Sequence, residues 1–148
     1  MRVSVVDRAK IGQHVENNFI KTIGLIDSAP AIGFDGSVYY TTIGESGTLY
    51  KHKPDGEREW GVPFDSGLRG SPAIDSKGLI YVFEDAGILH AIESVSSIGG
   101  PLVSYGKRVW QFIIPSEDRN AEGEYREHGN SPAIAEDNTV VFGWFDGN

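Results

Sequence analysis

The segment that decides the fold is Ser71-Pro72-Ala73-Ile74-Asp75-Ser76-Lys77-Gly78-Leu79-Ile80-Tyr81-Val82, because the chain carries it three times. Residues 29–40 and 131–142 align with it on their prolines without a gap. Each copy opens on Pro-Ala-Ile, continues through a polar turn and ends in a run of β-branched and aromatic residues. A proline that opens a strand suits a first or edge position, where no ladder N–H is lost. Each copy therefore predicts two short antiparallel strands joined by a tight turn.

Two of the copies continue alike beyond this segment. Gly47-Thr48-Leu49-Tyr50 matches Gly87-Ile88-Leu89-His90, and each is followed by a strand, a turn and a tryptophan, Trp60 or Trp110. Asp-Gly pairs suit tight hairpin turns that need a positive φ. A period of about 40–50 residues holding four short strands is typical of a β-propeller blade.

The two ends of the chain align with parts of the same repeat. Residues 3–7 match the third-strand segment 89–93, Phe19 stands where the tryptophans stand, and residues 142–148 align with 82–88. We therefore expect a half blade of third and fourth strands in residues 1–27, a full blade in 28–68, a second blade in 69–130 with insertions near 94–105 and 116–129, and a half blade of first and second strands in 131–148.

The predicted fold class is thus all-β, with four-stranded antiparallel propeller blades amounting to about three blade equivalents. Propellers close with about four to eight blades, so three do not close a ring. Half blades leave open strand edges, which favour pairing with another chain. Two interpretations remain: the chain is a segment of a longer propeller, or the ring is completed by oligomerisation. Two copies sharing blades would make a closed, two-fold symmetric ring.

The repeat resembles that of the pyrroloquinoline-quinone-like (PQQ-like) propeller family, in which Ser-Pro-Ala, a turn, Val-Tyr-Val, Gly-x-Leu-Tyr-Ala-Leu-Asp, Thr-Gly and Trp follow one another. The resemblance implies a docking contact, in which the Trp of one blade stacks on the Ala and Thr-Gly of the next. Lys51 stands in the alanine position of the first copy, and Asp55-Gly56 replaces Thr-Gly. The residues expected to dock the blades are Trp60, Trp110, Ala91, Gly106 and Gly56.

The family contains quinoprotein dehydrogenases and non-catalytic members, among them a lipoprotein of the outer-membrane β-barrel assembly machinery and sensor domains. The dehydrogenases resemble one another in a vicinal disulfide over the quinone and in a bound ion. This chain has no cysteine, so the resemblance points to the non-catalytic branch, without cofactor or bound metal. Relatives are usually exported, yet no signal peptide is recognisable in the first 20 residues, so the compartment stays open.

Charge and composition exclude further classes of function. The 148 residues hold 13 basic and 21 acidic side chains, a net charge of −8. Nucleic acid and anionic membranes need a basic face, so neither is an expected partner. The apolar runs are too short for a membrane-spanning helix. The chain also lacks a nucleophile elbow, a P-loop and a dinucleotide fingerprint.

The remaining candidates for recognition are polar. Of the four histidines, His52 and His90 fall on third strands and are expected to fill space, and no two histidines stand at metal-ligand spacing. The acidic insertion at 116–129 lacks calcium-loop spacing. It is either a solvated loop or a partner-contact loop. Its candidate contact residues are Glu117, Asp118, Arg119, Glu124 and His128.

The sequence therefore predicts a non-catalytic binding or scaffolding module for a protein or carbohydrate partner. One alternative is a fragment of a propeller enzyme, either a quinoprotein dehydrogenase or a sugar-acting hydrolase. The other alternative is a self-assembling module in which two chains share blades.

Overall fold

The computed structural model describes residues 2–4, 19–21, 24–96, 104–115 and 131–143. These residues form β-strands joined by turns and loops. The strands are β1 (Arg2–Ser4), β2 (Phe19–Lys21), β3 (Ala31–Ile32), β4 (Val38–Thr41), β5 (Thr48–His52), β6 (Arg58–Pro63), β7 (Ala73–Ile74), β8 (Ile80–Glu84), β9 (Ile88–Ser96), β10 (Ser104–Ile113), β11 (Ala133–Ile134) and β12 (Val140–Val141).

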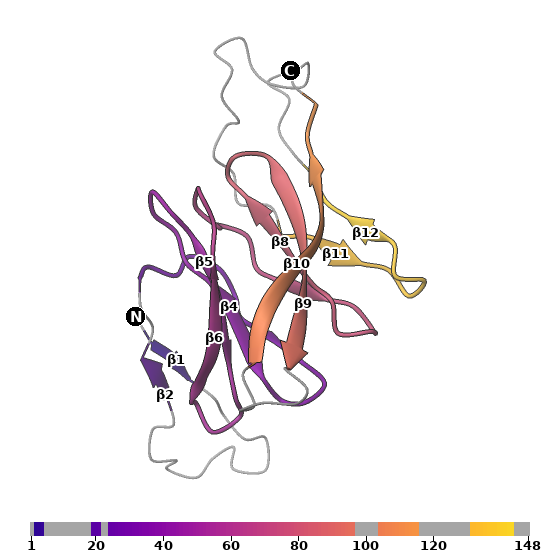
Figure 1. The fold of residues 1–148 in the computed structure, drawn as a ribbon. Coiled ribbons are helices and arrows are strands. Elements are labelled where there is room, and N and C mark those ends of the chain that lie inside the picture. Colours follow the sequence, from indigo (N-terminus) through magenta and orange to yellow (C-terminus); the bar gives the residue numbers. More distant parts are fainter. Residues whose placement is uncertain (1, 5–18, 22–23, 97–103, 116–130, 144–148) are drawn as a thin grey trace.

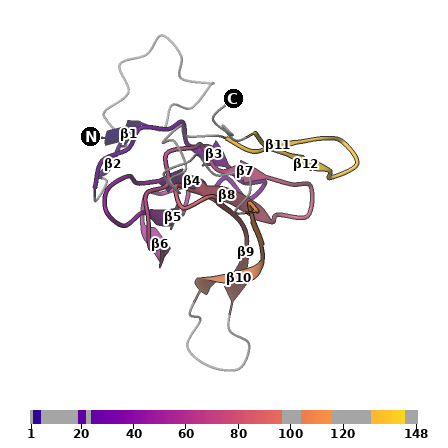
Figure 2. The ribbon, with the colours of Figure 1, turned by 90° about the horizontal axis from the view of Figure 1, so that it is seen from above.

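The strands make four antiparallel sheets. The first blade is β3-β4-β5-β6 and the second blade is β7-β8-β9-β10, each in chain order, while β1–β2 and β11–β12 are two-stranded. The sheets stand in a row with β1–β2 and β11–β12 at opposite ends (Figure 1). Seen from above, β3, β7 and β11 lie side by side, and the outer strands fan away from them (Figure 2). The predicted class, all-β with four-stranded propeller blades in an incomplete ring, is confirmed.

The turn after each first strand is built the same way three times. The backbone N–H groups of Gly36, Gly78 and Asn138 donate to the carbonyls of Gly33, Asp75 and Ala135, at 2.9 to 3.0 Å. All three donors have positive φ, +79°, +86° and +65°. Glycine adopts this left-handed region without a steric cost, and asparagine is the residue that tolerates it next best.

Serine hydroxyls link the first strands of successive sheets. The N–H of Ala29 donates to Oγ of Ser71 at 2.9 Å, and the N–H of Ser71 donates to Oγ of Ser131 at 2.9 Å. Ala29, Ser71 and Ser131 are the residues that precede the repeated prolines. The same position of the repeat therefore makes both contacts, and we call each of them a serine link.

The insertion near 94–105 is in part an extension of a hairpin. Ser96 pairs with Ser104 and Val95 with Tyr105, so β9 and β10 run well past the length of their counterparts β5 and β6. The sequence predicts an insertion into the repeat at this point. Its described residues continue the ladder, because strand pairing needs only alternating backbone bonds and not the repeat sequence.

The hydrophobic core lies between the sheets. Tyr39, Leu49, Trp60, Val62, Phe64, Leu68, Ile80, Val82 and Ile92 form the cluster between the two blades. A second cluster, around Tyr81, Phe83 and Ile114, continues to β11–β12 through Ile134 and Phe142. Face-to-face burial of sheets is what holds adjacent propeller blades together. Within the part of the chain that is described, no helix is long and apolar enough to cross a membrane.

Candidate functional site

The predicted docking residues Trp60 and Gly106 lie against each other between the blades. Trp60 is on β6 and Gly106 is on β10. A β-carbon built at Gly106 would lie 3.0 Å from Cζ3 of Trp60 and 2.5 Å from Cγ2 of Val62, closer than real contacts allow. The indole N–H of Trp60 donates to Oγ of Ser94 at 3.3 Å. The aromatic ring thus fills the space that a glycine leaves, and its one polar atom has a partner.

The other three predicted docking residues are placed differently. Trp110 is partly exposed, with its ring centroid 5.8 Å from that of Tyr81. Ala91 is fully buried and pairs with Trp110 across the β9–β10 ladder. Gly56 lies in the β5–β6 turn with φ +91°, and its carbonyl accepts a hydrogen bond from Nδ1–H of His52 at 2.9 Å. The structure therefore brings one pair of the five together across the blade interface.

The candidate partner loop lies outside the described residues. This holds for Glu117, Asp118, Arg119, Glu124 and His128. Among the residues that are described, no group of three or more His, Cys, Asp or Glu side chains could hold a metal ion.

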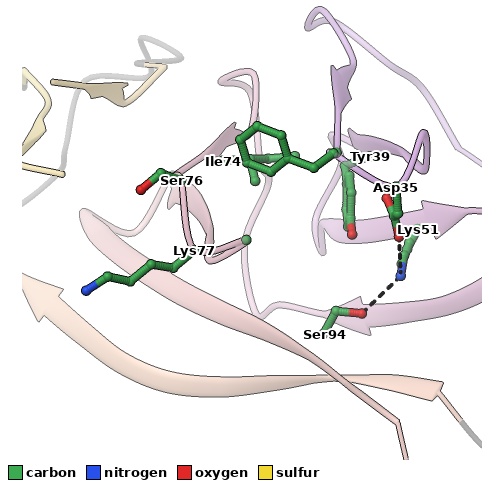
Figure 3. A pocket seen from close by; sticks show the side chains of 10 residues that line it. Asp35, Tyr39, Lys51, Ile74, Ser76, Lys77 and Ser94 are labelled. Carbon is green, nitrogen blue, oxygen red and sulfur yellow. Dashed lines mark hydrogen bonds and ion pairs between the residues drawn. The ribbon is translucent and has the colours of Figure 1, made fainter. Parts of the chain in front are cut away.

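A cleft of about 380 Å³ lies between the first and second blades. The β3–β4 turn forms one wall and the β7–β8 turn the other, with β5 and β9 beneath (Figure 3). The lining side chains that matter most to its chemistry are Phe34, Asp35, Lys51, Ser76, Lys77 and Ser94. We call this site the inter-blade cleft.

Lys51 is the charged centre of the inter-blade cleft, and its side chain is only 7% exposed. Its Nζ lies 3.0 Å from Oε2 of Glu59 and 3.5 Å from Oδ2 of Asp35. It also donates to Oγ of Ser94 on the second blade at 3.1 Å (Figure 3). A buried ammonium is tolerated only when it is paired and hydrogen-bonded, as it is here.

These contacts move two pKa values. Burial alone would lower the pKa of Lys51, but the hydrogen bond to Glu59 and the nearby negative charges outweigh burial and raise it above 10.5. Burial alone would raise the pKa of Asp35. The hydrogen bonds from Ser37 and the Lys51 charge outweigh that effect and hold the Asp35 pKa below 3.8. Both groups are therefore ionised at neutral pH.

Sequence reasoning missed this cluster, although one signal for it was present. Lys51 stands where the repeat has alanine, and a charged residue at a small buried position needs partners. The Asp35-Gly36 pair indicates only a turn, and Glu59 and Ser94 stand out in no way. The partners come from both blades, so sequence spacing alone does not bring them together.

Glu84, the last residue of β8, and His90 on β9 form a second buried ionisable pair. Nε2 of His90 is 2.7 Å from Oε2 of Glu84, and both side chains are almost fully buried. Oε1 of Glu84 accepts a hydrogen bond from the N–H of Ser66 at 2.8 Å. Burial would raise the pKa of Glu84, but these hydrogen bonds outweigh it and lower the pKa below 4.5. The pair ties the β6–β7 loop to the second blade.

Comparison with known proteins shows the fold. No family model matches the chain, and no curated protein matches it. Among solved structures it is similar to BamB from Moraxella catarrhalis, with a TM-score of 0.61 and 16% sequence identity. The alignment covers 87% of this chain and 35% of BamB, so the chain spans about a third of that protein's length. The arrangement of the sheets is therefore that of a β-propeller.

Proposed function

We propose that the chain is a non-catalytic binding module of the PQQ-like propeller type, which holds a protein or carbohydrate partner in the inter-blade cleft. The observation that carries this proposal is the wall of the cleft. Phe34 is 84% exposed there, beside the exposed side chains of Ser76 and Lys77 on the facing turn. An exposed aromatic ring together with polar and charged residues that line one hollow is the usual composition of a binding site.

The floor of the cleft supports binding because it is rigid. The ammonium of Lys51 joins Glu59 and Asp35 of the first blade to Ser94 of the second. These groups are ordered before a partner arrives, so less side-chain entropy is lost on association. The blades on either side are held by the Trp60–Gly106 contact.

The chemistry of the wall suits a sugar ring or an amphipathic peptide side chain. A sugar presents apolar C–H faces to an aromatic ring and hydroxyl groups to polar side chains, and Phe34 and Asp35 stand next to each other. The Asp35 side chain is more than half exposed and accepts hydrogen bonds. Lys77 adds an exposed cation, which suits a carboxylate on either class of partner.

The ionisation of the cleft argues for binding rather than catalysis. A general base works best with a pKa near the working pH. Asp35 is held below its ordinary pKa and is a weak base, and Lys51 is held above its ordinary pKa and keeps its proton. Neither group is therefore suited to act as a general base at neutral pH.

The membership of the PQQ-like type is supported by the threefold Ser-Pro-Ala or Ala-Pro-Ala repeat and by the contact between Trp60 and Gly106. The likeness to BamB supports the propeller part of the proposal. Within it, we propose that residues 28–68 and 69–130 are the two complete blades, flanked by half blades.

The test uses two libraries of probes, a glycan array and a phage library of random peptides. Ligands of the wild-type chain are measured again with Phe34→Ala and with Lys77→Glu, each expected to weaken binding about tenfold or more. Lys107→Glu, an exposed charge reversal on β10 away from the cleft, is the matched control and should bind as the wild type does. Ligands that all three variants bind equally would overturn the assignment of the cleft.

A further inference from the structure

The first blade exposes an apolar residue, Ile32, whose counterparts in the other sheets are covered. Ile32, Ile74 and Ile134 occupy the same position in β3, β7 and β11. Ile74 packs against the cluster between the blades, and Ile134 packs against the cluster of the second blade. Ile32 is 71% exposed. Its neighbour Ala31 packs against the cluster between the blades, so Ile32, the next residue along the strand, faces away from the second blade.

On this face of the first blade, Val38 pairs with Ile32 across the β3–β4 ladder and is buried together with Tyr40 and Ile26, so the uncovered part of the face is the part around Ile32. An apolar residue is also exposed at the opposite end of the row, in β11–β12. The ladders pair Ala31 with Tyr39, Ala73 with Tyr81 and Ala133 with Val141, so Val141 is the counterpart of the two tyrosines. Both tyrosines are 5% exposed, and Val141 is 58% exposed. The face of β11–β12 that points away from the second blade is thus uncovered as well.

The outer part of the second blade is only partly covered on the same side. Trp110 and Phe112 alternate along β10 as Trp60 and Val62 do along β6. Trp60 lies under Gly106 and is 6% exposed, whereas Trp110 is 43% exposed. In the same way, Val62 is 8% exposed and Phe112 is 43% exposed. Among the described residues, the second blade is followed by a sheet of two strands, β11 and β12. The first blade is followed by the four strands of the second blade.

The two uncovered faces carry the counterparts of residues that pack together between the two blades. Inside the chain, Ile74 packs against the cluster that contains Tyr39, and the uncovered counterparts at the ends are Ile32 and Val141. We propose that a second copy of this chain docks here, with the Ile32 face of one copy against the Val141 face of the other. The β1–β2 pair of the first copy then lies beside β11–β12 of the second, over Trp110 and Phe112.

A second copy is the favoured occupant because each chain carries both faces. Two copies form two identical junctions related by a two-fold axis, and in each junction an Ile32 face meets a Val141 face. Each junction also combines two two-stranded sheets into one of four strands, the size of the central sheets. Joining the strand edges in this way removes the open edges that otherwise favour uncontrolled pairing. This inference does not depend on the inter-blade cleft, which lies between blades of one chain.

The first experiment measures mass in solution by size-exclusion chromatography with light scattering. The expected mass is twice the 16.1 kDa of the chain. Ile32→Glu and Val141→Lys should each weaken association at least about tenfold, because each buries an unpaired charge in an apolar junction. The control is Phe34→Asp, because Phe34 is an even more exposed apolar residue, stands two positions from Ile32 and lines the cleft. This control should stay dimeric.

Mixing the two charged variants separates loss of the junction from loss of folding. A mixed pair has one unaltered junction and one junction in which the two substitutions meet, so that a carboxylate faces an ammonium. The mixture should therefore regain the dimer mass that neither variant reaches by itself. A wild-type chain that is monomeric at its highest soluble concentration would overturn the proposal. Failure of the mixture to recover the dimer, with both variants folded by circular dichroism, would overturn it too. Neither result would affect ligand binding in the cleft.

Discussion

The ring of Trp60 lies against the backbone of Gly106, and a single added methyl group at Gly106 would stand 3.0 Å from its Cζ3 atom. The two residues belong to different blades, so this contact sets how closely the blades approach. The glycine is required here by space, since the nearest atoms belong to Val62, Trp60 and Ile92 of the packed cluster.

We expect Gly106→Ala to destabilise the chain by about 1–3 kcal/mol, the usual cost of overpacking a filled core. The free energy of unfolding is measured by urea denaturation followed by tryptophan fluorescence. Gly143→Ala is the control, because a β-carbon there meets nothing within 4 Å. Equal stability of the two variants would contradict the close approach of the blades.

Removal of one serine link should have a small, local effect. Ser71→Ala deletes the acceptor of the Ala29 N–H, at an expected cost of about 0.5–1.5 kcal/mol. Hydrogen exchange followed by NMR should show faster exchange of the Ala29 amide and an unchanged rate for the amide at position 71, which still donates to Ser131. Ser46→Ala, an exposed serine between β4 and β5, is the comparison. Unchanged protection of Ala29 would argue against the link.

Lys51→Ala introduces the residue that stands at the same position of the second blade, Ala91. We expect a loss of about 3 kcal/mol, the low end for breaking a buried ion pair, because Glu59 and Asp35 lose their shared cation but keep contact with water. The pKa of Asp35 should rise, since the Lys51 charge is one of the effects that lower it.

NMR titration of the Asp35 carboxyl carbon measures that shift, and urea denaturation measures the stability. Lys53→Ala removes an exposed ion pair to Glu57 and should change stability little. An Asp35 pKa that is the same in Lys51→Ala as in the wild type would contradict the arrangement of the cleft.

Stability should fall in acid through Glu84. Its folded-state pKa lies below the ordinary 4.5, so its contribution is complete above pH 4.5 and is lost as the pH falls through the lower folded value. Glu84→Gln keeps the shape and removes the charge, so at neutral pH it should cost about 2 kcal/mol, a typical value for hydrogen bonds to a charged group.

Urea denaturation midpoints, measured from neutral pH down to the lowest pH at which the chain is folded, give the cost of Glu84→Gln and the loss of stability in acid. The variant should lose less stability on acidification than the wild type, and Glu136→Gln, in the exposed β11–β12 turn, should follow the wild type. Parallel profiles of Glu84→Gln and the wild type would rule out the buried pair as the source.

The parts of the fold that repeat could be predicted from the sequence. The three Pro-Ala-Ile segments predict the first strands β3, β7 and β11, because a repeated local pattern yields the same local structure wherever it occurs. The continuation of β9 to Ser96 could not be predicted, since the extra residues lie outside the repeat and pair only through their backbone.

The candidate site was harder to predict than the fold. The contact of Trp60 with a glycine followed from the resemblance, but the Lys51 cluster needs Ser94, which lies 43 residues away on the other blade. Its position depends on how the blades pack, and packing is set by many side chains at once. The one feature of the sequence that indicated the cluster is the lysine at position 51, where the repeat has alanine.

The serine link has a consequence for how such a chain can change in length. Each link joins the residue before one proline to the hydroxyl before the next, so both seams between units are chemically alike. A duplicated unit that begins at Ser71 recreates the same seam, whereas a duplicated unit that begins at Ala29 places an alanine where the seam needs a serine hydroxyl. A unit added by evolution or by engineering therefore keeps the seam only if a serine stands before its proline.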